Sequence, residues 1–165
     1  MIRAPDRRCR AGRWSNVLAW VVLASVASVP ADAATFRVDE AGTVVSQPVV
    51  NMRWRHLVPG RGADNTVEAS VRVDVRLNLA PWVNKPARLY MALSPVNSGR
   101  VLVRWSTQGR LLPGSLHSGE RALVFEGMAG PAIFNESLLL TMETDGERLT
   151  QLQNLNFHFE IEVSP

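Results

Sequence analysis

Cysteine is almost absent from this 165-residue chain, since the only one is Cys9, close to the N-terminus. One cysteine cannot form an intramolecular disulfide, and a thiolate metal site needs several. The three histidines, His56, His117 and His158, lie far apart and lack the H-x-H or H-E-x-x-H spacing of metal ligands. We therefore expect neither a disulfide nor a metal site.

Catalytic signatures are missing as well. The sequence has no G-x-S-x-G elbow, no phosphate-binding glycine loop and no dinucleotide fingerprint. Glu160 and Glu162 share one face of an expected strand, where they resemble the paired carboxylates of glycoside hydrolases. Solvated carboxylates on a polar strand face are far commoner. The sequence therefore predicts a protein that is not an enzyme and that binds no cofactor.

Long hydrophobic runs are also lacking, because the longest apolar stretch, residues 17–29, is shorter than the roughly 20 residues of a spanning helix. Five arginines precede this stretch, and Ala31-Asp32-Ala33 follows it. Basic, apolar and small-residue regions in this order are typical of a secretory signal. We predict that residues 1–33 are a cleavable signal peptide, the alternative being an uncleaved membrane anchor. The expected location is the periplasm or cell surface of a Gram-negative bacterium.

Net charge disappears with the predicted signal. The whole chain has 18 basic and 15 acidic residues, and removing the signal's five arginines and two aspartates leaves 13 of each. A neutral domain has no electrostatic footprint for nucleic acid or for an anionic surface. We therefore expect neither a nucleic-acid partner nor a membrane span after signal cleavage.

Two segments of the remaining sequence alternate regularly between apolar and polar residues. In residues 66–79 (TVEASVRVDVRLNL) and 154–163 (NLNFHFEIEV), every second residue is apolar. A period of two places one set of side chains in a core and the other in water, as in a half-buried β-strand. Both segments are predicted to be strands, and the second ends almost at the C-terminus.

Shorter strands are expected between turn signals. They cover residues 49–54, 87–93, 100–106, 121–126 and 136–143. Asp145-Gly146 resembles a two-residue hairpin turn, and residues 147–153 suggest a short helical turn or the start of the last strand. Strands at this spacing predict an all-β fold. We expect a single immunoglobulin-like antiparallel β-sandwich of about seven to nine strands, with an N-terminal arm or edge strands (34–58) and a body (59–165).

Tryptophan gives two further expectations. Trp105 continues the alternation of Val101 and Val103, so it is predicted to lie in the core. Trp82 falls in the loop that follows the longest strand, where an aromatic side chain is free to contact a ligand. Trp82 is therefore the candidate ligand contact.

The layout of signal, separate arm, β-only body and alternating C-terminal strand resembles that of a chaperone–usher fimbrial (pilus) subunit. The resemblance implies an incomplete sandwich that is completed by a strand from the next subunit. Phe36 and Val38 would then be the donor-strand plugs that enter the neighbour's groove. The arm departs from a clean donor strand, because Gly42 and Pro48 interrupt its alternation.

Two function classes follow from these expectations. In the first, the chain is an exported structural or assembly protein that pairs with copies of itself or other envelope proteins through sheet edges. In the second, it is a periplasmic or surface binding module for a carbohydrate or a protein, acting through Trp82.

Overall fold

The computed structural model describes residues 34–56, 62, 64–96, 100–148 and 156–163. The predicted signal peptide, residues 1–33, lies outside the described residues, so cleavage and export remain predictions. Among the described residues, no helix is long and apolar enough to cross a membrane.

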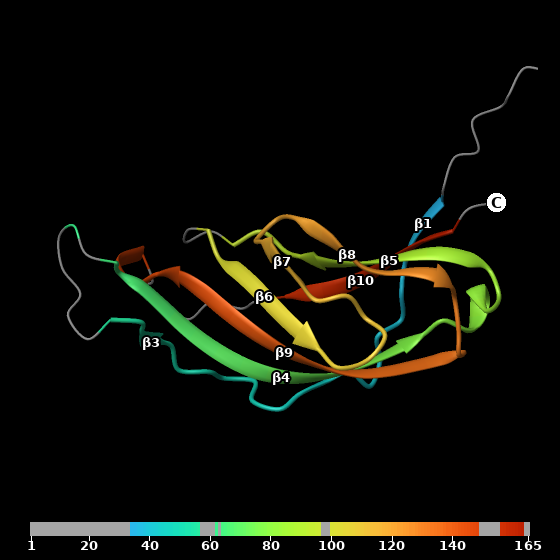
Figure 1. Cartoon of the computed structure of the whole chain (residues 1–165), viewed down its shortest axis with the longest axis horizontal. Helices are drawn as coiled ribbons and strands as arrows, with labels where there is room; N and C mark the ends of the chain where they lie inside the picture. Colours follow the sequence, from blue (N-terminus) through green and yellow to red (C-terminus); the bar gives the residue numbers. More distant parts are fainter. Residues whose placement is uncertain (1–33, 57–61, 63, 97–99, 149–155, 164–165) are drawn as a thin grey trace, which may run out of the picture. The chain divides into compact units, whose positions relative to one another are not determined.

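Two antiparallel sheets make up the described part of the chain (Figure 1). Sheet A has the order β1 (Ala34–Arg37), β10 (Phe157–Val163), β5 (Pro86–Leu93) and β8 (Arg121–Met128). Sheet B has the order β2 (Val44–Val45), β4 (Thr66–Asn78), β9 (Ile133–Asp145), β6 (Leu102–Thr107) and β7 (Gly114–His117). A further short strand, β3 (Arg53–Trp54), also pairs with β4. The prediction of an all-β antiparallel sandwich is confirmed, with ten described strands where seven to nine were expected.

Strict alternation explains the longest ladder. β4 pairs with β9 over thirteen residues, and its side chains alternate between buried and exposed along the strand. Val73 and Leu77 are completely buried, while Arg72 and Asp74 face water. The buried set packs against Phe159 of β10 in the other sheet, so the core lies between the two sheets.

Trp105 lies in this core, as its alternation predicts. Only 4% of its surface is exposed, and its indole Nε1 donates a hydrogen bond to the carbonyl of Leu112 (2.8 Å). Trp105 pairs across the ladder with Gly114 of β7. A Cβ atom at Gly114 would lie 2.8 Å from indole Cζ2, so this position has no room for a larger residue.

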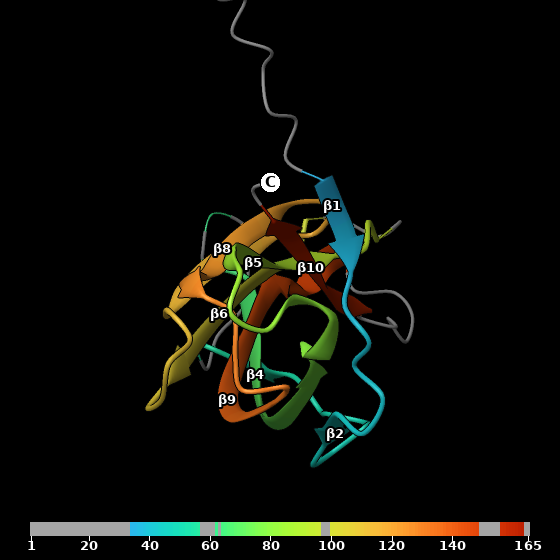
Figure 2. The same ribbon diagram turned by 90° about the vertical axis from the view of Figure 1, so that its right-hand side faces the viewer.

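The N-terminal arm contributes edge strands to both sheets. β1 lies beside β10 in sheet A, and the chain then passes to β2 at the edge of sheet B (Figure 2). β3 follows on the same edge, in place of the longer strand expected over residues 49–54. The arm is thus part of the sandwich over its described residues, 34–56.

One sequence expectation about a turn is wrong, and one strand was missed. Asp145-Gly146 does not form a hairpin, because β9 ends at Asp145 in sheet B and β10 belongs to sheet A. Gly146–Arg148 instead forms a 3₁₀ helix, η2, and residues 149–155 lie outside the described part. Strand β7 was not expected at all, because Pro113-Gly114 and His117 resemble turn residues.

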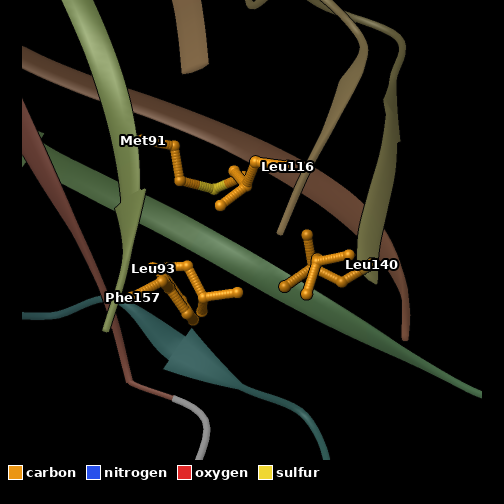
Figure 3. Close-up of a pocket in the computed structure, with 6 residues that line it drawn as sticks. Met91, Leu93, Leu116, Leu140 and Phe157 are labelled. Carbon is orange, nitrogen blue, oxygen red and sulfur yellow. The ribbon is translucent and has the colours of Figure 1, made fainter. Parts of the chain in front are cut away.

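A small apolar cavity lies between the two sheets, as Figure 3 shows. It is lined by Met91, Leu93, Val103, Leu116, Leu140 and Phe157. Its volume of about 10 Å³ is no more than one water molecule occupies. This cavity is therefore too small for a ligand of the size of a sugar or a peptide side chain.

Candidate functional site

Strand β1 is held on the chain's own C-terminal strand. Its four residues pair antiparallel with β10, Phe36 opposite Ile161 and Arg37 opposite Glu160. All four are exposed, so β1 rests on the edge of sheet A and buries little surface of its own. No other described strand pairs with the second edge of β1, so its backbone groups there are available to a further strand.

The other sheet edges are better protected. On one side of sheet B, β2 and β3 have two residues each, with Pro48 between them. On its other side, the amide of His117 in β7 already donates to the Glu120 carboxylate (3.1 Å). In sheet A, the Leu112 amide bonds the Val124 carbonyl at the edge of β8 (2.7 Å). Short strands, prolines and covering segments prevent edge pairing. Among the described strands, β1 is thus the edge with least protection.

The two predicted plug residues have different environments. Val38 is 1% exposed and belongs to the chain's own core, and its amide bonds the Phe159 carbonyl (2.9 Å). Phe36 points to the same side of sheet A but is 46% exposed. Val38 therefore packs in the core of its own chain, whereas the Phe36 side chain stays accessible.

Trp82 lies next to Phe36 and is half-buried. It ends the short 3₁₀ helix η1 (Ala80–Trp82), and its amide bonds the Leu79 carbonyl (2.9 Å). The Trp82 and Phe36 rings are 5.8 Å apart at 40°, within the range of a favourable aromatic pair. We call these two residues the rim pair. Trp82 also packs against the core, so it is less exposed than its loop position suggests.

The arm is firmly anchored after Arg37. Asp39 and Asn78 form a β-bridge, and the Thr43 hydroxyl accepts from the Arg76 amide (3.0 Å). Farther along, the Ser46 amide donates to the Arg72 carbonyl (3.0 Å). These bonds tie the arm to β4, whereas residues 34–37 are held by their ladder with β10, the rim pair and an exposed ion pair between Arg37 and Glu40 (3.3 Å).

Arg55, near the end of the described arm, forms ion pairs with two carboxylates of sheet B. Its guanidinium bonds Glu143 (2.8 Å) and Glu68 (3.3 Å), and the hydrogen bond to Glu143 raises the pKa of Arg55 most strongly. Arg104 pairs with the same Glu143 carboxylate from β6. Glu143 is therefore buried between two arginines at the outer face of sheet B, and the two ion pairs offset the cost of burying a carboxylate.

Arg121 crosses the outer face of sheet A and holds two carboxylates of β10. Its guanidinium lies 4.5 Å from the centre of the Tyr90 ring and pairs with Glu160 (3.2 Å) and Glu162 (2.8 Å). Partial burial raises the pKa of Glu162, but hydrogen bonds from Tyr90 and Arg121 outweigh it and leave this pKa below its ordinary value. Burial and the bond to Glu162 raise the pKa of Tyr90. Glu162 is therefore an ion-pair partner, whereas a general acid needs a raised pKa.

The histidines each lie beside a single acid. His56 is 3.3 Å from Asp64, His117 is 3.4 Å from Glu120, and His158 is 3.1 Å from Glu160. Across residues 34–56, 62, 64–96, 100–148 and 156–163, no three His, Cys, Asp or Glu side chains gather as metal ligands would.

The fold and these edges define an all-β protein of two antiparallel sheets with an accessible N-terminal strand. No protein-family model, no curated protein and no solved structure matches the chain. The geometry of β1, β10 and the rim pair is therefore the basis for the functional argument.

Proposed function

We propose that this chain is an exported structural subunit of the bacterial envelope whose copies join by exchanging β1, in the manner of fimbrial subunits. The observation that carries the proposal is the placement of β1: four exposed residues paired with β10 at the least protected edge. Phe36 would act as the plug, and Val38 would stay in its own core.

Exchange of β1 costs little at equilibrium. When β1 leaves its own β10 and pairs with β10 of a second copy, the same ladder and the same rim contact re-form, as in domain swapping. If each copy gives β1 to the next, the contact is heterologous and the chain of copies stays open. Such a fibre is what an assembly protein of this class would form.

Backbone alternation gives a sharp test. Because the Val38 amide bonds β10, the amide of Phe36, two residues earlier, also faces β10, while that of Thr35 faces the free edge. Proline lacks an amide hydrogen. We expect Phe36→Pro to prevent assembly and Thr35→Pro, the matched control, to permit it.

Assembly is measured by light scattering after size-exclusion chromatography of the purified chain, with far-UV circular dichroism to verify folding. Deleting residues 34–37 should give folded monomers, whereas a deletion that extends through Val38 should also lose stability. Wild-type chain that stays monomeric, or Phe36→Pro chain that assembles normally, would contradict exchange of β1. Loss of assembly only in Thr35→Pro would instead indicate addition of a strand to the free edge.

A second candidate function, ligand binding by the rim pair, is favoured by the exposure of Phe36 beside Trp82. In this case the pair would accept an apolar or aromatic group of a partner protein, or the face of a sugar ring. Trp82→Ala would then abolish binding in a chain that remains monomeric. Assembly that depends on Phe36 would argue against this candidate.

A further inference from the structure

The outer face of sheet B has a polar depression that is independent of β1. It lies beside β2, where the arm runs along β4 and β9, and has a volume of about 490 Å³. It is lined by Gly42, Asp74, Val75, Arg76, Asn135, Glu136 and Ser137. This volume is within the range of roughly 300–1,000 Å³ that is usual for small-molecule sites.

The depression takes its shape from contacts among its own residues. The Ser137 hydroxyl donates to Asp74 Oδ1, and Arg76 Nη1 donates to the Ala41 carbonyl (3.1 Å). Gly42 has φ +99°, and a Cβ there would lie 3.0 Å from Arg76 Cδ. Glycine thus allows the arm to approach Arg76 closely, which forms one wall of the depression.

Unused hydrogen-bonding groups converge in the depression. Asn135 lies opposite Arg76 in the ladder and is exposed, and its amide makes no hydrogen bond to another residue in the described part of the chain. The remaining guanidinium hydrogens of Arg76 and the second oxygen of Asp74 add donors and an acceptor. Three side chains therefore offer both donors and acceptors to one ligand.

The lining also restricts the chemistry of the ligand. Val75 is 2% exposed with its side chain in the core, and the Glu136 carboxylate accepts from the Arg110 amide (2.8 Å) on the other side of the strand. Both residues thus contribute only backbone, and the depression has no apolar side chain for an apolar ligand. Asp74 and Arg76 carry opposite charges, so neither an anion nor a cation is favoured.

We propose that this depression binds a neutral carbohydrate, whose neighbouring hydroxyl groups donate to Asp74 and Asn135 and accept from Arg76 and Asn135. No aromatic ring lines the site to stack on a sugar, so the expected affinity for one residue is weak, with Kd on the order of 1 mM. The site is distinct from Trp82 and from the β1 edge. It would allow an assembled fibre to contact glycans along its length.

The test is a titration of the ¹⁵N-labelled chain, followed by two-dimensional NMR, with the methyl glycosides of glucose, galactose and mannose. N-acetylneuraminic acid is the anionic comparison. We expect saturable shifts at the amides of Gly42, Arg76, Asn135 and Ser137 with at least one neutral glycoside at up to about 50 mM. Asn135→Ala should weaken binding roughly tenfold, because it removes two hydrogen bonds, and leave the melting temperature unchanged.

Ser106→Ala is the matched control, since Ser106 is exposed on the same face of sheet B but lies outside the depression. It should bind the glycoside as the wild-type chain does. The proposal is overturned if no neutral glycoside gives saturable shifts at these amides, if N-acetylneuraminic acid binds more tightly than all three, or if Asn135→Ala binds unchanged. Because an assembled fibre would broaden the amide signals, the titration uses the monomeric fraction from size-exclusion chromatography, so failure to bind a glycoside is distinguishable from failure to assemble.

Discussion

Phe36 and Val38 provide the most informative comparison, because sequence alternation treats them alike and the structure does not. Val38→Ala removes two methyl groups from a side chain that is 1% exposed. At about 0.8 kcal/mol per buried carbon, with a small cavity term, this should lower the free energy of unfolding by about 2 kcal/mol. Phe36 is 46% exposed, so Phe36→Ala forfeits only about half of a phenylalanine's burial, roughly 1 kcal/mol.

Assembly should respond in the opposite order. If β1 is exchanged, Phe36 packs on the neighbouring copy and Val38 stays in the core of its own chain. Phe36→Ala should therefore reduce polymerisation, and Val38→Ala should not. Urea unfolding of monomers gives the first ranking, and light scattering at equal concentrations of folded protein gives the second. If both variants lost stability and assembly in parallel, this would refute the inference that residues 34–37 are exchanged while the arm from Val38 onward stays anchored.

Three further predictions concern the fold. Val73→Asp should abolish folding, because it leaves an unpaired charge at a completely buried position and costs several kcal/mol. Arg72→Asp, on the exposed face of the same strand, is the control and should fold. Expression level and thermal melting measure both variants. Gly114→Ala should cost about 1–3 kcal/mol by displacing the Trp105 indole, visible as a change in near-UV circular dichroism; an unchanged spectrum and melting point would disprove the tight contact. The folded-state pKa of Glu162 is lowered, so its contribution to stability is present above its unfolded pKa and is lost as pH falls through the folded value. Glu162→Gln should therefore flatten the decline in unfolding free energy between about pH 5 and pH 3, and an equally steep decline would contradict this.

Local pattern was sufficient for the strands that alternate without interruption. β4 and β10 follow from period-two alternation, and Trp105 follows from its neighbours. β7 was missed because Gly114 resembles a turn residue, whereas its function is to leave space for the Trp105 indole across the ladder. The need for this space arises only because β6 pairs with β7. The residues around Gly114 alone do not indicate which strand will pair with them.

The candidate sites show the same division between local and distant information. Phe36 and Trp82 stand out in the sequence as separate aromatic residues, but only the fold brings their rings together. The polar depression joins Arg76 of β4 to Asn135 of β9 through the register of one long ladder. Arg121 reaches Glu160 and Glu162 across three strands. Each arrangement depends on strand order, which composition and spacing do not encode.

The different burial of Phe36 and Val38 has its cause in the opposite sheet. Val38 is followed by the bridge between Asp39 and Asn78, so it lies where β4 still faces sheet A. β4 ends at Asn78, and the chain turns into η1. Phe36 lies two residues before Val38, beyond the end of β4. Its ring therefore contacts Trp82 and no described strand of the opposite sheet, and it remains accessible. The length of β4 thus sets where the core ends and where the exposed strand β1 lies.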